Sequence, residues 1–236
     1  MSAPGWNVLD NGPIEKLEEN LWAVEGGIPA LPMKRRMTVV RLGDGSLVVH
    51  NAICLEENAQ RELDAWGRVR FIVVPNGWHR IDAPAYAARY PDAKVVCPDP
   101  ARRRVAKKVR VDGNLSLLPA DPSLAHVALE GSSIAEQVLS VRSGRRTTLV
   151  FNDTLFNLPK LPGFKGWVYG LIGSTGAPKV TPLVRTVSVR DRAALRRQLE
   201  ILAETPGLER VIPGHGFSAE GADPAHHVLR AAAASL

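Results

Sequence analysis

Histidine and aspartate side chains occur in three short stretches of the sequence, each of which follows an apolar run. The first stretch is PNGWHRID (75–82), which contains His79 and Asp82. The second is FNDTLF (151–156), which contains Asp153, and the third is IPGHGF (212–217), which contains His215. Imidazole nitrogens and carboxylate oxygens are common ligands of zinc and non-haem iron. If the apolar runs are strands, their ends could surround one divalent ion.

Such an ion would lower the pKa of a bound water and polarise the oxygen of a substrate. Asp153 is the candidate catalytic residue, because it would hold the ion and orient that water, while His79 and His215 complete the ligand set. Two histidines and one carboxylate suit zinc and also iron. We therefore expect at most one divalent metal ion, zinc or iron, and the alternative is a chain that holds none. The substrate would be an ester, thioester or phosphoester.

Each candidate ligand also has a purely structural interpretation. Asp82 precedes Pro84, which is the pattern of a helix N-cap with proline in the first turn, and this role outweighs that of a metal ligand. His79 fits a metal ligand and a hydrogen-bonding turn residue equally well. Asp153 could bind the backbone N–H groups of its own loop.

Aromatic residues near these stretches are candidate substrate contacts. Trp78 lies beside His79, and the other three, Phe164, Trp167 and Tyr169, fall in a segment rich in glycine and proline (157–182). A long segment with few helix or strand signals is usually functional or mobile. Such a wall would suit a partly apolar substrate, and simple packing is the alternative.

The elements that must position these residues alternate along the chain. Apolar runs rich in β-branched residues predict strands at 21–25, 37–42, 46–50, 70–75, 94–98, 115–119, 126–129, 137–141, 147–151 and 210–213. Helices are predicted at 57–66, after Asp82, after Asp191 with an apolar stripe of Leu195, Leu199 and Leu202, and near Asp223. The glycines of GDG (43–45) indicate a hairpin. The pattern predicts an α/β (α+β) protein, a four-layer αββα sandwich.

Positive charge is concentrated in one segment. The net charge is +6, and ARRRVAKKVR (101–110) holds six basic residues and no acidic one. Without those six, 24 basic residues balance 24 acidic ones. On a helix, Arg103, Lys107 and Arg110 would share one face that could contact phosphate. A solvated face is the favoured interpretation, because no aromatic residues alternate with these charges to stack bases.

Composition bounds the class of protein. At 236 residues and 45% hydrophobic content, the chain can form one large domain, and we expect a single domain over 1–236. No apolar run approaches the roughly 18 residues of a membrane span, and no secretory signal is visible. Cys54 and Cys97 do not form a metal-type pair. We expect a cytoplasmic protein with a small-molecule substrate or ligand and with neither membrane nor nucleic acid as partner; its oligomeric state is open.

The three motifs together resemble the metallo-β-lactamase superfamily over roughly residues 17–218. The resemblance is carried by WAVE…TVVRLGDGSLVVHNAICL, FNDTLF and VIPGHG. It is closest to a poorly characterised branch with a reduced P-N-x-x-H signature, here Pro75, Asn76 and His79. The resemblance implies the αββα fold and a hydrolase with one or two zinc or iron ions between its sheets.

The ligand positions of that superfamily are only partly filled in this sequence. The resemblance assigns its bridging aspartate to Asp153 and its final histidine to His215. Its H-x-H-x-D-H loop falls on Asn76, Trp78, Arg80 and Ile81 in one register, and on Gly77, His79, Ile81 and Asp82 in the other. A further histidine position falls near Gly131, where Ser132 stands. The signature is therefore degenerate.

Two hypotheses of function follow. The first is a mononuclear metal-dependent hydrolase with a reduced site, which the joint presence of Asp153 and His215 favours. The second is a non-catalytic member of the same fold that binds a small molecule or partner in the former cleft, which the replaced ligand positions favour. Nucleic-acid binding rests on the basic run alone.

Overall fold

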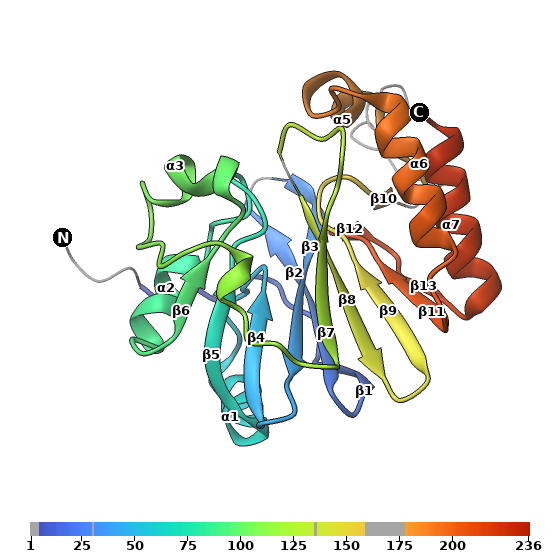
Figure 1. The fold of residues 1–236 in the computed structure, drawn as a ribbon. Coiled ribbons are helices and arrows are strands. Elements are labelled where there is room, and N and C mark those ends of the chain that lie inside the picture. Colours follow the sequence, from blue (N-terminus) through green and yellow to red (C-terminus); the bar gives the residue numbers. More distant parts are fainter. Residues whose placement is uncertain (1–4, 30, 135, 159–177) are drawn as a thin grey trace. The chain divides into compact units, whose positions relative to one another are not determined.

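The computed structural model describes residues 5–29, 31–134, 136–158 and 178–236 (Figure 1). The chain divides into two compact units, Met1–Ala125 and His126–Leu236. Each unit contains its own sheet and its own buried apolar cluster. The single domain expected from the sequence stays a prediction.

The first unit is built on a six-stranded sheet. Its strands, in spatial order, are β1 (Glu15–Glu18), β2 (Leu21–Ile28), β3 (Leu31–Arg41), β4 (Ser46–His50), β5 (Arg68–Val73) and β6 (Lys94–Val96). Strands β1 to β4 pair antiparallel, whereas β4, β5 and β6 are parallel. The parallel strands need crossovers, which helices α1 (Glu57–Trp66) and α2 (Ala83–Arg89) supply. The predicted GDG hairpin joins β3 to β4, and Gly45 has the left-handed φ of 80° that this turn requires.

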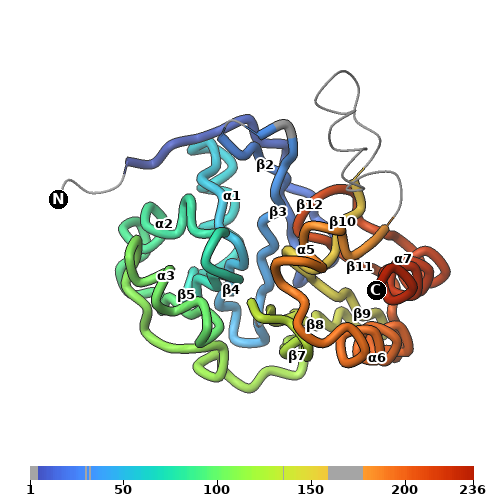
Figure 2. Tube along the Cα trace, turned by 90° about the horizontal axis from the view of Figure 1, so that it is seen from above, coloured from blue at the N-terminus to red at the C-terminus, as the bar shows by residue number. Residues whose placement is uncertain are grey.

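The helices of the first unit cover one face of its sheet (Figure 2). Leu63 of α1 and Tyr86 of α2 are fully buried against Met37, Val39 and other strand residues. Helix α1 has the bounds predicted from the sequence and ends at Gly67. A Cβ atom at Gly67 would lie 2.4 Å from the carbonyl oxygen of Gly45, so close backbone approach requires glycine here.

The second unit is built on a five-stranded sheet and a two-stranded one. The larger sheet has the order β13 (Ala219–Glu220), β11 (Leu208–Ile212), β9 (Arg146–Val150), β8 (Gln137–Ser143) and β7 (Leu124–Ala128), the last starting just before the boundary. The smaller sheet pairs β10 (Phe156–Asn157) with β12 (His215–Gly216). Strands β9 and β11 are parallel, and the chain between them includes α5 (Pro182–Val187) and α6 (Arg192–Ala203).

Helices α6 and α7 (Ala222–Ala234) lie side by side on the second unit's sheet (Figures 1 and 2). The carboxylate of Asp191 accepts a hydrogen bond from Ala194 N at 2.9 Å, which confirms the predicted N-cap of α6. The predicted apolar stripe, Leu195, Leu199 and Leu202, is buried in the core of this unit.

Two segments differ from the sequence prediction. The strand predicted at 115–119 is a 3₁₀ helix, Leu115–Leu117, because the Asn114 side chain accepts a hydrogen bond from Ser116 N and starts a turn. The basic run forms only one helical turn, α3 (Arg102–Val105). The single face predicted for Arg103, Lys107 and Arg110 is therefore wrong. In the described part of the chain, no helix is long and apolar enough to cross a bilayer.

Candidate metal centre

Asp153 lies in a tight loop directly after β9, and a buried glutamate holds this loop. Glu136 accepts hydrogen bonds from Asn152 N and Thr154 N, both at 2.7 Å, and from the Thr154 hydroxyl at 2.9 Å. Glu136 is fully buried. The two residues that flank Asp153 are thus fixed by Glu136 through their backbone.

The Glu136 carboxyl group has an unusual protonation equilibrium. Burial raises its pKa to about 7, and the charge of Asp153 adds to the increase, while the N–H groups of Asn152 and Thr154 oppose it. Three donors and no acceptor point at the group, so its ionised form makes every available hydrogen bond. The loop that carries Asp153 is therefore hydrogen-bonded to the Glu136 carboxylate, whose pKa is near neutral pH.

His215 lies directly after β11, in a segment that two glycines allow to pack closely. Gly214 N donates to Asn152 O at 3.1 Å, and His215 pairs with Phe156 in the parallel β10–β12 ladder. Gly216 has a left-handed φ of 96°, and a Cβ atom there would lie 2.2 Å from the carbonyl oxygen of Asn157. His215 is 4% exposed, and its ring stacks on Phe156 with the ring centroids 5.0 Å apart.

These two strand ends bring two of the predicted ligands together. Val150 at the end of β9 pairs with Ile212 at the end of β11, so the residues that follow lie at one edge of the sheet. His215 Nε2 lies 3.3 Å from Asp153 Oδ1. With ligand bonds of about 2.1 Å, that separation corresponds to an angle of roughly 105° at a shared ion, close to tetrahedral. The donor atoms and their spacing fit a zinc or iron ion.

His79, in the first unit, lies in a loop after β5 that Asn76 organises. Asn76 Oδ1 accepts hydrogen bonds from Trp78 N at 2.8 Å and His79 N at 3.1 Å. The Asn76 side chain therefore acts as a turn-forming acceptor, which accounts for the asparagine at a position where the superfamily signature has a histidine.

Asn51 determines which nitrogen of His79 carries the proton. Asn51 Nδ2 donates to Arg36 O at 2.9 Å, and this bond fixes the orientation of the amide. Asn51 Oδ1, an acceptor, then lies 3.1 Å from His79 Nδ1. Because Nδ1 must donate, the neutral imidazole has its lone pair on Nε2. This is how protein histidines that bind metals through Nε2 are commonly held.

Asn51 adopts an uncommon backbone conformation directly after β4. Its φ of 57° is the one positive value of a non-glycine residue in the described chain. Asparagine tolerates this region better than most residues. Asn51 N also donates to Val73 O at 3.0 Å, so the backbone of the residue is anchored to β5 and its side-chain amide to β3.

Asp82 stands at the helix N-cap predicted from the sequence, but its side chain has a different role. It precedes α2, but its side chain makes no N-cap hydrogen bond. Instead, Asp82 Oδ2 forms an ion pair of 2.5 Å with Arg35 Nη2 and accepts a hydrogen bond from Cys54 N at 2.9 Å. Arg35 is 2% exposed and also donates to Ala52 O. Asp82 therefore stands at the predicted N-cap position of α2, but its carboxylate balances a buried guanidinium and caps no backbone N–H group of the helix, so we do not assign it to an ion.

The remaining predicted residues are distributed as follows. Trp78 is 43% exposed at the surface of the first unit. Phe164, Trp167 and Tyr169, the other predicted substrate contacts, lie outside the described residues. Ser132, at the position of a superfamily histidine, forms an isolated bridge with Val189, and its buried hydroxyl has no hydrogen-bond partner in the described part of the chain.

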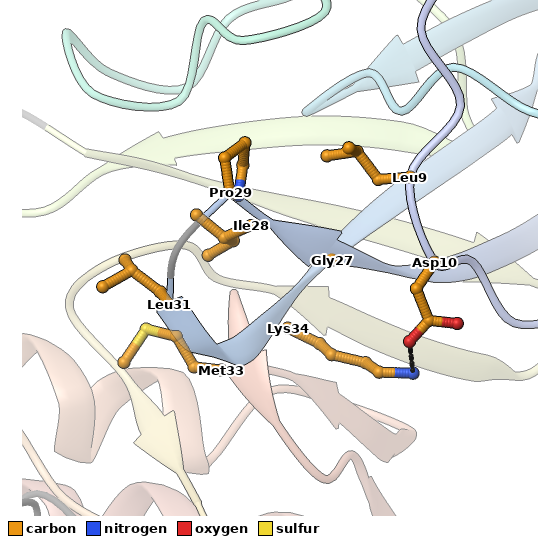
Figure 3. Close-up of a pocket in the computed structure, with 8 residues that line it drawn as sticks. All are labelled: Leu9, Asp10, Gly27, Ile28, Pro29, Leu31, Met33 and Lys34. Atoms are coloured by element: carbon orange, nitrogen blue, oxygen red, sulfur yellow. Dashed lines mark ion pairs between the residues drawn. The ribbon is translucent and has the colours of Figure 1, made fainter. Parts of the chain in front are cut away.

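A pocket of about 340 Å³ lies at the β2–β3 hairpin of the first unit (Figure 3). Leu9, Ile28, Pro29, Leu31 and Met33 supply apolar walls, and Gly27 backs it. Its two charged residues, Asp10 and Lys34, form an ion pair of 3.5 Å with each other. The pocket therefore offers apolar space and contains none of the predicted ligands.

Sequence reasoning missed two residues that position the candidate ligands. Asn51 left a usable signal, since an asparagine at the end of a strand is a typical site of left-handed backbone. Glu136 left none, because one acidic residue before a strand looks like an ordinary loop residue. Its role depends on a loop 16 residues away in the sequence.

Comparisons with known proteins bear on the fold. A family model described as a domain of unknown function, DUF4336, matches residues 18–101. No curated protein matches this chain in sequence.

Solved structures of metallo-β-lactamases match most of the chain. One from Pontibacter korlensis has a TM-score of 0.59 at 11% identity, covering 92% of this chain and 97% of its own. The DIM-1 enzyme has a TM-score of 0.64 at 14% identity, covering 97% and 98%. The FIM-1 enzyme of Pseudomonas aeruginosa, in a mono-zinc form, has a TM-score of 0.60 at 10% identity, covering 98% of both chains. The predicted αββα class is confirmed: the chain has the metallo-β-lactamase fold.

Proposed function

We propose that this protein is a mononuclear metal-dependent hydrolase with a reduced ligand set of His79, Asp153 and His215. Asp153 and His215 lie side by side in the second unit, and His79, in the first unit, is the third ligand that the sequence predicts. The observation that carries the proposal is the 3.3 Å approach of His215 Nε2 to Asp153 Oδ1. The hydrogen bond from Gly214 N to Asn152 O holds the two backbone segments together, and the Glu136 carboxylate holds the Asp153 loop.

Each ligand has a role that its surroundings support. When bound, the ion supplies a water of lowered pKa and polarises the oxygen of the substrate. Asp153 would hold the ion and would orient the water bound to it. His79 presents the Nε2 lone pair that Asn51 fixes, and His215 is held by its stacking on Phe156. Because only three side chains would hold the ion, we expect it to bind more weakly than the ions of a dinuclear hydrolase.

Elemental analysis of purified protein tests the ion directly. We expect one zinc or iron ion per chain, lost in each of the variants His79→Ala, Asp153→Asn and His215→Ala. His126→Ala is the matched control, because His126 is exposed and bonds only the Gln137 side chain among the described residues. Two ions per chain, or no ion after incubation with zinc, iron or manganese, would contradict the proposal. Incubation is needed because weakly held ions are lost in purification.

Activity is measured on the ion-loaded protein with ester, thioester and phosphoester substrates. We expect hydrolysis of one class, abolished by Asp153→Asn and unchanged by His126→Ala. Hydrolysis that survives removal of the ion by a chelator would exclude the metal-dependent mechanism.

A second candidate function is that of a non-catalytic binding protein, and the contacts of the loop at residues 75–82 favour it. Asn76 and Asp82 are engaged in a backbone turn and a buried ion pair, and Trp78, Arg80 and Ile81 complete a loop that has one histidine. A ligand that binds equally well with and without the ion, and that is never hydrolysed, would establish this second function.

A further inference from the structure

The His79 loop also carries a cationic surface formed by Trp78, Arg80 and Arg104, all in the first unit. The Arg104 guanidinium lies over the Trp78 ring, 4.9 Å from its centroid. Arg80 Nη1 donates a hydrogen bond to Arg104 O, which ties the loop to helix α3. We call these three residues the Trp78–Arg104 surface.

Gly77 makes this arrangement possible. A Cβ atom at Gly77 would lie 2.9 Å from Arg104 Cδ and 3.0 Å from Arg104 Cβ. The aliphatic part of Arg104 therefore lies across the loop at the one residue without a side chain, and this places the guanidinium over Trp78. The position of Arg104 is a consequence of close packing and not of an ion pair.

Among the described residues, no carboxylate forms an ion pair with the charges of this surface. Neither Arg80 nor Arg104 forms an ion pair with a carboxylate in the described part of the chain. Arg103 and Lys107 beside them are exposed and are likewise without an acidic partner among the described residues. By contrast, Arg110 at the end of the run donates to Pro91 O and Ala93 O, both at 2.6 Å, so it has a structural role that the sequence did not reveal.

We propose that the Trp78–Arg104 surface binds the phosphate group of a small-molecule ligand beside His79. Guanidinium groups present paired N–H donors that match phosphate oxygens, and Arg80 and Arg104 supply two such groups on neighbouring residues of this surface. Trp78 is 43% exposed and offers an aromatic face or edge to a planar part of the same ligand. The sequence alone shows no aromatic residue within the basic run, but the fold brings Trp78 to it.

This inference deepens the proposed function, because it selects the phosphoester among the substrate classes considered for the same site. Binding can nevertheless be tested without hydrolysis. The probe is inorganic pyrophosphate, added to the whole protein in the presence of a chelator, so that no ion takes part. The signal is tryptophan fluorescence, and Trp78→Phe identifies the part of it that comes from Trp78.

Two variants test the surface by different means. Arg104→Glu reverses the charge, and we expect at least tenfold weaker binding of pyrophosphate. Gly77→Ala leaves the charge unchanged but displaces Arg104 from the ring, and we expect several-fold weaker binding. Arg68→Glu is the matched control, since Arg68 is exposed at the opposite end of β5 and carries the same charge change. The affinity of Arg68→Glu for pyrophosphate should stay within twofold of that of the wild-type protein.

The outcomes separate clearly. Saturable quenching that Arg104→Glu and Gly77→Ala weaken and Arg68→Glu spares supports the proposal, even if the protein proves to hold no ion. Equal weakening by Arg104→Glu and Arg68→Glu would show a general charge effect and overturn it. No response to pyrophosphate, with salt-sensitive binding of a single-stranded RNA 20-mer, would also overturn it in favour of a nucleic-acid surface.

Discussion

Replacement of Gly214 by alanine tests whether the two strand ends set the geometry of the metal site. Gly214 N donates to Asn152 O, and the added Cβ atom would lie 2.6 Å from that oxygen and 2.8 Å from the carbonyl carbon and Cα of Asn152. All three atoms belong to the backbone and cannot rotate away. An ordinary contact begins at 3.4 Å, so the segments that carry Asp153 and His215 must separate by about 0.8 Å.

A displacement of that size exceeds what a metal site tolerates. Ligand distances in such sites hold to within about 0.2 Å, and disturbance of the groups that orient ligands typically costs about tenfold to a hundredfold in affinity. We therefore expect Gly214→Ala to weaken zinc binding by at least tenfold. Overpacking should also lower the free energy of unfolding by about 1–3 kcal/mol.

Gly144→Ala is the control that separates stability from site geometry. Gly144 lies in the β8–β9 turn of the same unit with a left-handed φ of 61°, and nothing lies within 4 Å of its added Cβ atom. The strain should lower the free energy of unfolding by about 1–2 kcal/mol and leave zinc affinity unchanged. Affinity is measured by competition with a chromophoric chelator, and stability by urea unfolding without zinc.

Two results would refute this reasoning. Wild-type zinc affinity in Gly214→Ala would mean that the β9 and β11 ends do not set the ligand spacing. A loss of affinity in Gly144→Ala as large as that in Gly214→Ala would mean that binding follows overall stability and not the position of the ligands.

Buried polar groups in the first unit give three further predictions. Asp82→Ala leaves the buried Arg35 guanidinium without its carboxylate, so urea unfolding should show a free energy of unfolding about 3–5 kcal/mol lower. Adding Arg35→Met should restore part of it, and a decrease below about 1 kcal/mol would contradict the buried pair. Burial lowers the pKa of His50 to about 3, and the charge of His79 adds to the decrease. The unfolded chain binds this proton near pH 6.5, so the stability that the neutral His50 contributes is present above pH 6.5 and is lost as the pH falls toward 3. Urea unfolding between pH 7 and 5 should show a smaller slope in His50→Phe, and equal slopes would contradict the assignment. Asn51→Gly keeps the left-handed backbone but removes Oδ1, so zinc affinity should fall. Loss of the amide that donates to Arg36 O should also lower the free energy of unfolding by about 1–3 kcal/mol. Unchanged zinc affinity would rule out the positioning of His79 by Asn51.

The sequence predicts the elements well where local signals agree. Strand β4 and helix α1 have the predicted bounds, because apolar periodicity and the flanking glycines indicate the same limits. The predicted strand at 115–119 is wrong because an asparagine side chain outweighs the apolar run that follows it. The basic run is a single helical turn, whereas its composition suggested a longer helix.

The candidate site is predictable only in part. His79, Asp153 and His215 are found from the rule that functional side chains follow strands, and the parallel β9–β11 pairing places two of them together. Asp82 illustrates the limit, since its partner Arg35 lies 47 residues away and no local pattern connects them. Asn51 and Glu136 act on the candidate ligands through tertiary hydrogen bonds, which are properties of the folded chain and not of any motif.

The parallel pairing of β9 with β11 also has a kinetic consequence. Asp153 and His215 are about 60 positions apart in the sequence, and closing a loop of this length opposes early contact between them. An ion that needs both side chains would therefore bind the folded second unit and not a partly folded chain. It would raise the melting temperature with the logarithm of its concentration and would slow unfolding without accelerating refolding. An ion bound by Asp153 and His215 would then be present only in chains whose second unit has folded.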